Sequence, residues 1–401
     1  MASRNRLVRA LASATSHLWF PATVAVARNL PRRIVRPGAR RLGSAYFRTR
    51  PKYWNAVSAN LSVILGQPAD SAEVARAADE MFRGHFAAWF DFLYFASRPP
   101  HESAADGFTE DDAVEMKRWG EPPALEHPRE HTEIGRFELE RAAKLSGARF
   151  GFLAGDTALL AFALYRLALD RLVAEGFTPM IPPVLVREDA MYGTGFFPSD
   201  KSDYYAVPED GLYLVGTSEV PLIGMHIEEI LEELPINYCA FSSCFRREAG
   251  AAGRDTRGMF RVHQFQKVEM VAYTHPDESW DMHERMLAIE ESLVLTVELP
   301  YRVVNTAAGD LSTAAAKRYD TEAWFPSQQR YREITSCSNT TDFQARRSGI
   351  RYRTEDGRLE TPHTLNGTAA TDRWVLAILE NFQGEVPEAL QRYGAPERVR
   401  G

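Results

Sequence analysis

Hydrophobic residues recur at helical spacing in four segments of the chain. The clearest segment covers residues 156–175, where leucine and phenylalanine form one apolar face and Gly176 follows as a helix stop. The same spacing predicts helices over residues 71–95, with Ser71 as the N-cap, over 279–297 and over 373–382. The apolar face of residues 71–95 is rich in aromatic side chains, which indicates core packing or an interface rather than a cofactor site.

Strand patterns lie between the helices predicted over residues 156–175 and 279–297. Residues 212–215, 238–246 and 260–273 are predicted as strands, and residues 177–186 as an extended segment that Pro179, Pro182 and Pro183 interrupt. The strands and helices do not follow the strand–helix–strand rhythm of a parallel sheet. The pattern therefore predicts an α+β fold with a mainly antiparallel sheet.

A change of character near residue 100 predicts two domains. The pair Pro99-Pro100 and the polar, acidic stretch 101–112 have the composition of a linker. We therefore expect a separate helical N-terminal region over residues 1–110, basic at its start and then aromatic-rich, and a second domain over residues 111–401.

Charge is distributed unevenly, although the net formal charge is only −7. Residues 1–60 contain twelve Lys or Arg and no Asp or Glu, which leaves 35 basic against 54 acidic residues in the rest of the chain. Such a basic start suits contact with a membrane surface or an RNA backbone, resembles a mitochondrial transit peptide, and is also compatible with a plain solvated segment. These alternatives stay open at this point.

The chain has three cysteines, Cys239, Cys244 and Cys337, without CxxC spacing. They are too few for a disulfide framework and have the wrong spacing for structural zinc. We therefore expect a reducing compartment and a cytoplasmic protein.

The most informative polar run is Phe245-Arg246-Arg247-Glu248, which a small charged loop and a second strand follow. This order predicts a hairpin with a cationic stem. Paired guanidinium groups on a strand suit bidentate contact with phosphate oxygens. Taken alone, an arginine pair on a strand is more often ordinary surface charge.

Two further clusters have related chemistry. In residues 332–339 the carboxylate of Glu333 is adjacent to hydroxyl side chains, and such hard oxygen ligands suit Mg²⁺ bound to ATP. The run from Asn366 ends in Arg373 at the start of an apolar helix, where the helix dipole adds to the attraction for phosphate. Each cluster is weak by itself, because a Glu beside Ser or Thr usually forms only a local hydrogen-bonded turn.

The order and spacing of longer sequence blocks point to a family. The blocks are Trp119-Gly120-Glu121-Pro122-Pro123, Glu130-His131-Thr132-Glu133-Ile134-Gly135, residues 137–150, Ala190-Met191-Tyr192-Gly193-Thr194-Gly195, Thr217-Ser218-Glu219-Val220-Pro221, residues 245–258 and 333–347, Thr364-Leu365-Asn366-Gly367, and residues 378–383. Over residues 112–401 the chain resembles seryl-tRNA synthetase, a class II aminoacyl-tRNA synthetase. The resemblance implies the class II fold, a mainly antiparallel sheet flanked by helices.

The resemblance also implies roles for particular residues. Arg246, Glu248 and Arg373 would be catalytic. Serine would be bound by Thr217, Ser218, Glu219, Glu269 and Thr368. ATP would be bound by Arg246, Arg247, Glu248, Val262, Glu333, Ile334, Thr335, Ser336 and Arg373, with Mg²⁺ on Glu333 and Ser336. A carboxylate that accepts the serine hydroxyl would reject alanine, because alanine leaves that buried charge without its partner.

The implied reaction is ATP-dependent activation of L-serine to seryl-adenylate, followed by transfer to tRNA. The implied partners are L-serine, ATP, Mg²⁺ and tRNA, and the implied assembly is a homodimer whose contact surface lies around residues 177–186. We keep two alternatives: transfer of the activated amino acid to a carrier protein or small-molecule acceptor, and a catalytically weak binding or regulatory paralogue.

Several features depart from the family pattern. Residues 1–110 show no sustained heptads, so we expect the tRNA-gripping coiled-coil arm to be missing. Residues 27–99 faintly resemble the start of bacterial lipid A-type acyltransferases, and His101 and Asp106 have their HxxxxD spacing, although nothing after them continues such a domain. The loop from Gly367 to Arg373 reads one residue shorter than in the family. There the adjacent Asp372 is expected to weaken the ATP grip by partial neutralisation of Arg373.

Overall fold

The computed structural model describes residues 70–82, 100–198, 201–248 and 258–401, together with residues 41, 54, 55, 57, 58, 61 and 68. The chain divides into two compact units, Met1–Pro99 and Pro100–Gly401. The expected basic contact surface, the missing arm and most of the acyltransferase-like stretch fall on residues outside this description. Within the described part of the chain, no helix has the length and apolar character needed to cross a membrane.

In the first unit the structure describes a helix over residues 72–82. Ser71 Oγ accepts a hydrogen bond from the Val74 amide at 3.2 Å, which confirms the predicted N-cap. Val74, Ala78 and Phe82 are buried on one face, and Phe82 stacks on Trp54 with ring centres 5.7 Å apart. The predicted continuation of this helix to residue 95 lies outside the described residues.

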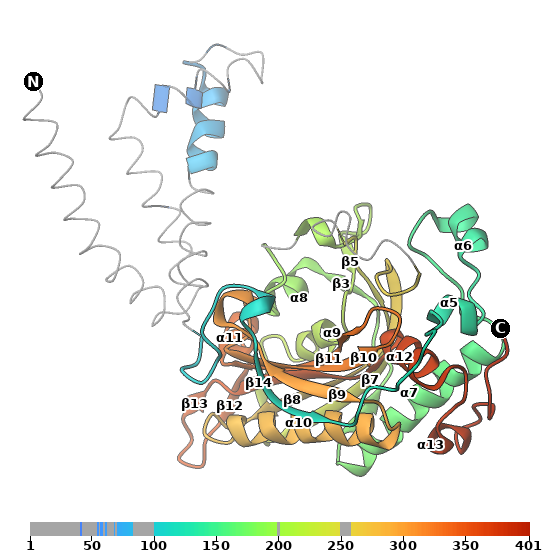
Figure 1. The fold of residues 1–401 in the computed structure, drawn as a ribbon. Coiled ribbons are helices and arrows are strands. Elements are labelled where there is room, and N and C mark those ends of the chain that lie inside the picture. The colour runs from blue at the N-terminus through green and yellow to red at the C-terminus, as the bar shows by residue number, and fades with distance from the viewer. Residues whose placement is uncertain are drawn as a thin grey trace, which may run out of the picture. The chain divides into compact units, whose positions relative to one another are not determined.

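The second unit is built on an eight-stranded sheet with the strand order β1-β9-β10-β11-β14-β8-β7-β2 (Figure 1). Its strands are β1 (Val114–Trp119), β2 (Thr178–Met180), β7 (Ile236–Phe245), β8 (Gln264–Thr274), β9 (Tyr301–Asn305), β10 (Lys317–Phe325), β11 (Arg330–Thr341) and β14 (His363–Thr371). Every neighbouring pair is antiparallel except β2 with β7. This confirms the predicted α+β fold with a mainly antiparallel sheet.

Two small sheets accompany the large one. They are β3 (Leu185–Arg187), β5 (Leu212–Leu214) and β4 (Ala206–Val207) in one, and β13 (Leu359–Glu360), β12 (Arg351–Arg353) and β6 (Ile230–Leu231) in the other. The remaining helices of this unit are α5 (His131–Ile134), α6 (Leu139–Ser146), α7 (Asp156–Ala174), α8 (Glu188–Gly193), α9 (Glu219–Gly224), α10 (Ser279–Thr296), α11 (Phe343–Ser348), α12 (Asp372–Phe382) and α13 (Glu388–Gln391), with short 3-10 turns at Glu110–Asp112, Lys201–Asp203 and Ala308–Asp310.

The helices cover the two faces of the large sheet differently. On one face α7, α10 and α12 bury the main hydrophobic core, to which alternate β8 residues such as Val268, Met270 and Ala272 contribute. On the other face α8, α9 and α11 surround the strands (Figure 1), and the intervening β8 residues Val271 and Tyr273 pack beneath α9. The period of two along β8 thus directs its charged residues Lys267 and Glu269 to the α9 side.

Two local differences from the sequence prediction have clear causes. The strand predicted over 260–273 begins at Gln264, because residues 258–263 form turns and bends instead. The stretch expected to be a linker instead packs on the second unit: the Asn305 side-chain amide donates to the Ser103 carbonyl, and the Ala308 amide to the Ala105 carbonyl, both at 2.8 Å. The division between the two compact units falls at Pro99–Pro100, at the start of this stretch.

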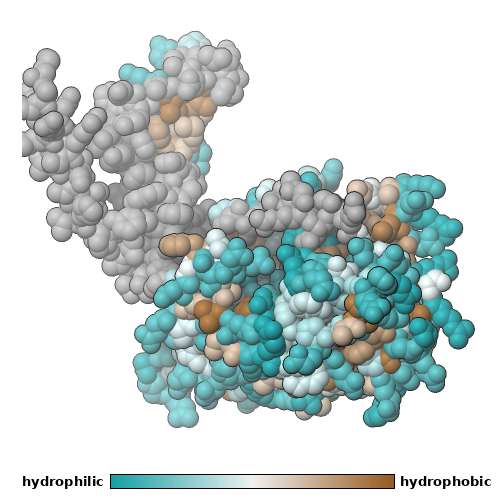
Figure 2. Space-filling model, viewed as in Figure 1, coloured by the Kyte–Doolittle hydropathy of each residue, from teal (hydrophilic) through white to brown (hydrophobic). Residues whose placement is uncertain are grey.

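The HxxxxD pair does not form a catalytic dyad. His101 Nδ1 shares a hydrogen bond with Ser103 Oγ at 2.8 Å, and its ring lies 4.0 Å from the Trp280 ring centre. Asp106 is exposed. In the view of Figure 2 the surface of the second unit is mainly hydrophilic, with hydrophobic side chains in small separate patches.

Candidate active site

A cavity of about 380 Å³ lies on the α9 side of the large sheet. Its walls come from β8, β11 and β14, from the start of α9, from the chain after β7 and from the N-terminal end of α12. The sequence-predicted residues that line it are Thr217, Glu219, Arg246, Glu248, Val262, Glu269, Glu333, Ile334, Thr335, Ser336, Thr368 and Arg373. The structure thus brings together residues from five separate stretches of the chain.

Two predicted residues lie outside the cavity wall. Ser218 is fully buried, and its hydroxyl shares a hydrogen bond with Ser242 Oγ at 2.6 Å. Arg247 is exposed, donates from Nε to the Tyr204 carbonyl at 3.2 Å and stacks over the Tyr205 ring. Because neighbouring residues of an extended chain point to opposite sides, only Arg246 of the arginine pair faces the cavity.

One end of the cavity is rich in buried carboxyl groups. Glu219 Oε1 accepts hydrogen bonds from Gln344 Nε2 at 2.5 Å and from Asn366 Nδ2 at 2.9 Å, and the Glu219 amide donates to Thr217 Oγ1 at 3.2 Å. Burial, together with the negative charge of Glu269, raises the pKa of Glu219 to about 7. This carboxyl therefore changes its charge near neutral pH.

Glu269 lies on β8 in the same end of the cavity. Lys267 Nζ is 2.5 Å from Glu269 Oε2, and Thr368 Oγ1 donates to the same oxygen at 3.3 Å. Burial raises the pKa of Glu269, while Lys267 opposes the rise. The lysine and the glutamate are both buried, so each supplies the counter-charge that the other requires.

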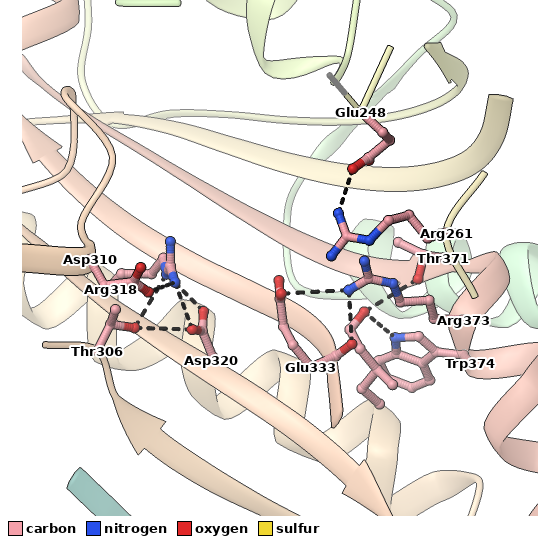
Figure 3. Close-up of polar contacts among 11 residues, drawn as sticks. Glu248, Arg261, Thr306, Asp310, Arg318, Asp320, Glu333, Thr371, Arg373 and Trp374 are labelled. Atoms are coloured by element: carbon pink, nitrogen blue, oxygen red, sulfur yellow. Dashed lines mark hydrogen bonds and ion pairs between the residues drawn. The ribbon is translucent and has the colours of Figure 1, made fainter. Parts of the chain in front are cut away.

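The other end of the cavity is cationic. Arg373 Nη1 donates to the Glu333 carbonyl at 3.0 Å and lies 3.5 Å from Glu333 Oε2 (Figure 3). The guanidinium groups of Arg332 and Arg373 lie 3.8 and 4.8 Å from the Phe260 ring centre. Although burial acts to raise the pKa of Glu333, the nearby arginines outweigh it and lower this pKa, so the carboxylate is ionised.

Two further arginines complete this end. Arg246 donates from Nε to the Gly216 carbonyl at 3.3 Å and lies 5.3 Å from the Phe265 ring centre. Arg261 pairs with Glu248, as Figure 3 shows. Planar cations beside the rings of Phe260 and Phe265 form an arrangement suited to a polyphosphate and a nucleobase.

Comparison with known proteins decides the family. The model of the tRNA synthetase class II core domain (G, H, P, S and T) matches residues 205–382. The serine–tRNA ligase of Thermobifida fusca (strain YX) is 56% identical over 295 residues, which are 71% of this chain and 70% of that protein. The chain belongs to the seryl-tRNA synthetase family.

Further similarities support membership of the seryl-tRNA synthetase family. The serine–tRNA ligase of Nocardia farcinica (strain IFM 10152) is 53% identical over 303 residues, 73% of this chain and 72% of that protein. The structure of seryl-tRNA synthetase from Pyrococcus horikoshii complexed with ATP superposes with a TM-score of 0.75 at 36% identity, over 91% of this chain and 92% of that chain. The cytoplasmic serine–tRNA ligase from Naegleria fowleri in complex with AMP gives a TM-score of 0.72 at 35% identity, over 81% and 73%. The expected class II fold is therefore confirmed.

Asp372, which precedes Arg373 in the sequence, does not pair with Arg373. The Asp372 carboxylate accepts hydrogen bonds from the Tyr165 hydroxyl and, at 3.0 Å, from the Gln266 amide. Burial raises the pKa of Asp372 to about 6. Its partners lie on α7 and β8, whereas Arg373 turns to Glu333, so the expected partial neutralisation of Arg373 is not what the geometry shows.

The segment expected to be one residue short remains a regular part of β14 apart from one irregularity. Thr368 pairs with Glu269 and Ala370 with Val268, so the register shifts between these positions. Pairing resumes at Thr371 opposite Lys267. Thr368 accordingly still faces the cavity, and Arg373 still lies in the first turn of α12 beside it.

Sequence reasoning missed three cationic wall residues of this seryl-tRNA synthetase family member, Lys267, Arg261 and Arg318. Lys267 is two residues before Glu269, so the period of two along a strand places both on one face and was the signal available for it. Arg318 Nη2 lies 2.9 Å from Asp320 Oδ2 and 3.4 Å from Asp310 Oδ2, and these bonds are visible in Figure 3. Nothing in the local pattern around Arg261 or Arg318 distinguished them from surface residues.

Proposed function

We propose that this protein activates L-serine with ATP and transfers the seryl group to tRNA. The observation that carries the proposal is the pairing, within one cavity, of the Glu269–Thr368 contact at one end with the arginines around Phe260 at the other. The first end fits a small amino acid with a hydroxyl group, and the second fits the phosphates of a nucleotide. Membership of the seryl-tRNA synthetase family supports both assignments.

Serine recognition rests on the carboxylate-rich end. The serine ammonium group is matched by Glu219, whose carboxylate lies in the wall near Thr217. The serine hydroxyl donates to Glu269, which pairs with Lys267 and which Thr368 holds in place. Alanine would occupy the same space but leave the buried carboxylate without its third donor, which is costly.

ATP binding rests on the cationic end. As the family resemblance implies, Arg246 and Glu248 hold the α-phosphate and adenine, Val262 borders the nucleotide, and Arg373 binds the γ-phosphate. The support from the structure is that all four residues line the cavity. Ile334 and Thr335 form the wall next to Glu333 on β11. Arg247 and Ser218 then act indirectly, Arg247 through its bond to the Tyr204 carbonyl and Ser218 through its contact with Ser242 on β7.

The residues present fit a magnesium ion that is bound mainly through ATP. Glu333 is ionised and faces the cavity beside Ser336, and both provide hard oxygen ligands. Among the described residues, no group of three or more His, Cys, Asp or Glu side chains converges as a metal cage. Glu333 and Ser336 would therefore hold Mg²⁺ together with phosphate oxygens and water, and the ion would supply additional neutralisation of the polyphosphate.

The chemistry follows from this arrangement. A serine carboxylate oxygen attacks the α-phosphorus of ATP, and the bond from that phosphorus to the oxygen bridging to the β-phosphate breaks, which releases pyrophosphate. A terminal ribose hydroxyl of tRNA then attacks the seryl carbonyl and displaces AMP. Arg246 and Arg373 stabilise the charge that develops on the phosphates, so catalysis consists mainly of positioning and electrostatic stabilisation.

The protein is further proposed to act as a homodimer in the cytoplasm. The surface expected for dimer contact, residues 177–186, contains Ile181 with 95% exposure and includes β2 at the edge of the large sheet. Phe162 on α7 is 66% exposed and Leu145 on α6 is 75% exposed. Such apolar exposure supports burial by a second copy. Three thiols without disulfides support a reducing compartment.

Amino-acid-dependent exchange of pyrophosphate into ATP, measured with each of the twenty amino acids, tests the activation step. Exchange that depends on serine supports the proposal, and exchange with no amino acid contradicts it. Charging of bulk tRNA with labelled serine then tests the acceptor. Serine-dependent exchange without tRNA charging would favour a carrier protein or a small-molecule acceptor.

A further inference from the structure

His131 and Glu380 form a buried pair outside the cavity. His131 belongs to α5 and is 4% exposed, and Glu380 belongs to α12 and is fully buried. Glu380 Oε1 accepts from the His131 amide at 3.3 Å and contacts His131 Nδ1 at 2.7 Å. Glu380 Oε2 accepts from the Ser327 hydroxyl at 2.6 Å and the Ser327 amide at 3.2 Å. The hydrogen bonds of the Glu380 carboxylate thus connect separate segments of the chain.

The second ring nitrogen of His131 determines the tautomer. Its Nε2 accepts the Met259 amide at 3.2 Å, so Nε2 carries no hydrogen and Nδ1 is the donor toward Glu380. The backbone approaches so closely here that a Cβ at Gly258 would lie 2.6 Å from His131 Nε2. Gly258 also has a φ of +65°, so glycine meets both the steric and the conformational requirement.

Met259 immediately precedes two cavity residues. Phe260 is the ring on which Arg332 and Arg373 stack, and Arg261 pairs with Glu248. Glu380 follows Arg373 by seven residues, which is two helical turns, so both lie on one side of α12. Figure 1 shows α5 beside α12. One buried hydrogen-bond chain therefore connects the helix that carries Arg373 with the backbone that carries Phe260 and Arg261.

We infer that His131 and Glu380 are positioning residues for ATP: together they fix the Met259–Arg261 backbone against α12 so that Phe260 and Arg261 are placed at the phosphate end. This inference rests on the proposed function for the meaning of that end. The pair does not touch the carboxylate-rich end, so its loss weakens ATP binding more than serine binding. The bond to the Met259 amide is the link that transmits the effect.

The test uses His131→Phe in the full-length protein, because phenylalanine fills the ring volume but has neither a donor for Glu380 nor an acceptor for the Met259 amide. We expect the KM for ATP in pyrophosphate exchange to rise about tenfold, with the KM for serine changed by less than about twofold. Hydrogen exchange at the Met259 amide should become faster, because this amide loses its acceptor. Glu380→Gln keeps the shape of the carboxyl group and should give the same direction with a smaller change.

Asn381→Ala is the matched control. Asn381 is the next residue on α12, is 6% exposed and donates to the Trp324 carbonyl at 2.7 Å, away from Met259. It should lower the Tm as His131→Phe does while leaving the KM for ATP unchanged. If the two variants change both KM values alike, or if His131→Phe leaves the KM for ATP unchanged, the inference is overturned. Absence of pyrophosphate exchange in the unmodified protein would instead overturn the proposed function. Hydrogen exchange at the Met259 amide would still test whether His131 and Glu380 fix the Met259–Arg261 backbone.

Discussion

Carboxyl groups lie at both ends of the cavity, but their electrostatic environments are opposite. At the serine end, Glu219 and Glu269 lie near the buried cation Lys267, and burial raises the pKa of both carboxyl groups. At the phosphate end, several arginines surround Glu333, and they lower its pKa against the effect of burial. The first end is short of positive charge and the second is short of negative charge.

This difference shows how one cavity distinguishes an ammonium group from a polyphosphate. An end that is short of positive charge favours an ammonium group, and an end that is short of negative charge favours a polyphosphate. The same carboxylate chemistry gives a titrating group in the first environment and a permanently ionised group in the second. Variants that change charge should therefore have different consequences at the two ends.

The largest effect is expected from Arg246→Ala at the phosphate end. Loss of the guanidinium group removes stabilisation of the charge developing on the α-phosphate, so kcat/KM in pyrophosphate exchange should fall about 10³-fold. Arg247→Ala is the matched control, because Arg247 points to the Tyr204 carbonyl, and it should cost no more than about threefold. Equal losses in the two variants would show that the cavity wall is assigned incorrectly.

Glu269→Ala should give the next largest effect, at the serine end. It removes the acceptor for the serine hydroxyl and leaves Lys267 without its partner, so serine-dependent exchange should fall about 100-fold. Exchange that depends on alanine as the substrate should fall far less, so the measured preference for serine over alanine should shrink. An unchanged preference would place the specificity determinant elsewhere.

The titration of Glu219 predicts a pH effect on serine alone. With a pKa of about 7, Glu219 is ionised above that pH and becomes neutral as the pH falls through it. The KM for serine should therefore rise about tenfold for each pH unit below 7, while the KM for ATP stays nearly constant. Glu219→Gln should bind serine more weakly and remove the pH dependence. A wild-type profile without inflection near pH 7 would contradict this assignment.

The smallest effect on activity is expected from Asp372→Ala. The variant leaves the Tyr165 hydroxyl and the Gln266 amide without their acceptor, which should cost about 2 kcal/mol of unfolding free energy, measured by urea denaturation. The KM for ATP should not improve, because Asp372 does not pair with Arg373. Asp277→Ala, at an exposed position, is the control for stability. A clear gain in ATP affinity would instead support the prediction from the sequence that Asp372 partly neutralises Arg373.

Elements with strong periodicity were predictable from the sequence to within a few residues. The helix predicted over 279–297 is α10, Ser279–Thr296, and the strand predicted over 238–246 is β7, Ile236–Phe245. The charged residues of the cavity wall were harder to predict, because a Lys and a Glu on one strand face usually indicate that this face is exposed to solvent. Only coverage of that face turns Lys267 and Glu269 into a buried pair. The environment of Asp372 was not predictable for a related reason: its partner Tyr165 is 207 positions away in sequence.

The three cysteines have a consequence for following the molecule in solution. Cys239 and Cys244 lie in β7 and Cys337 lies in β11, and all three are buried. Burial raises the pKa of Cys239 to about 12 and also raises the pKa of the other two thiols. Alkylating reagents attack the thiolate and need access to it, so labelling requires the strands to separate. The rate of thiol alkylation therefore measures how often the catalytic sheet opens, without an introduced probe.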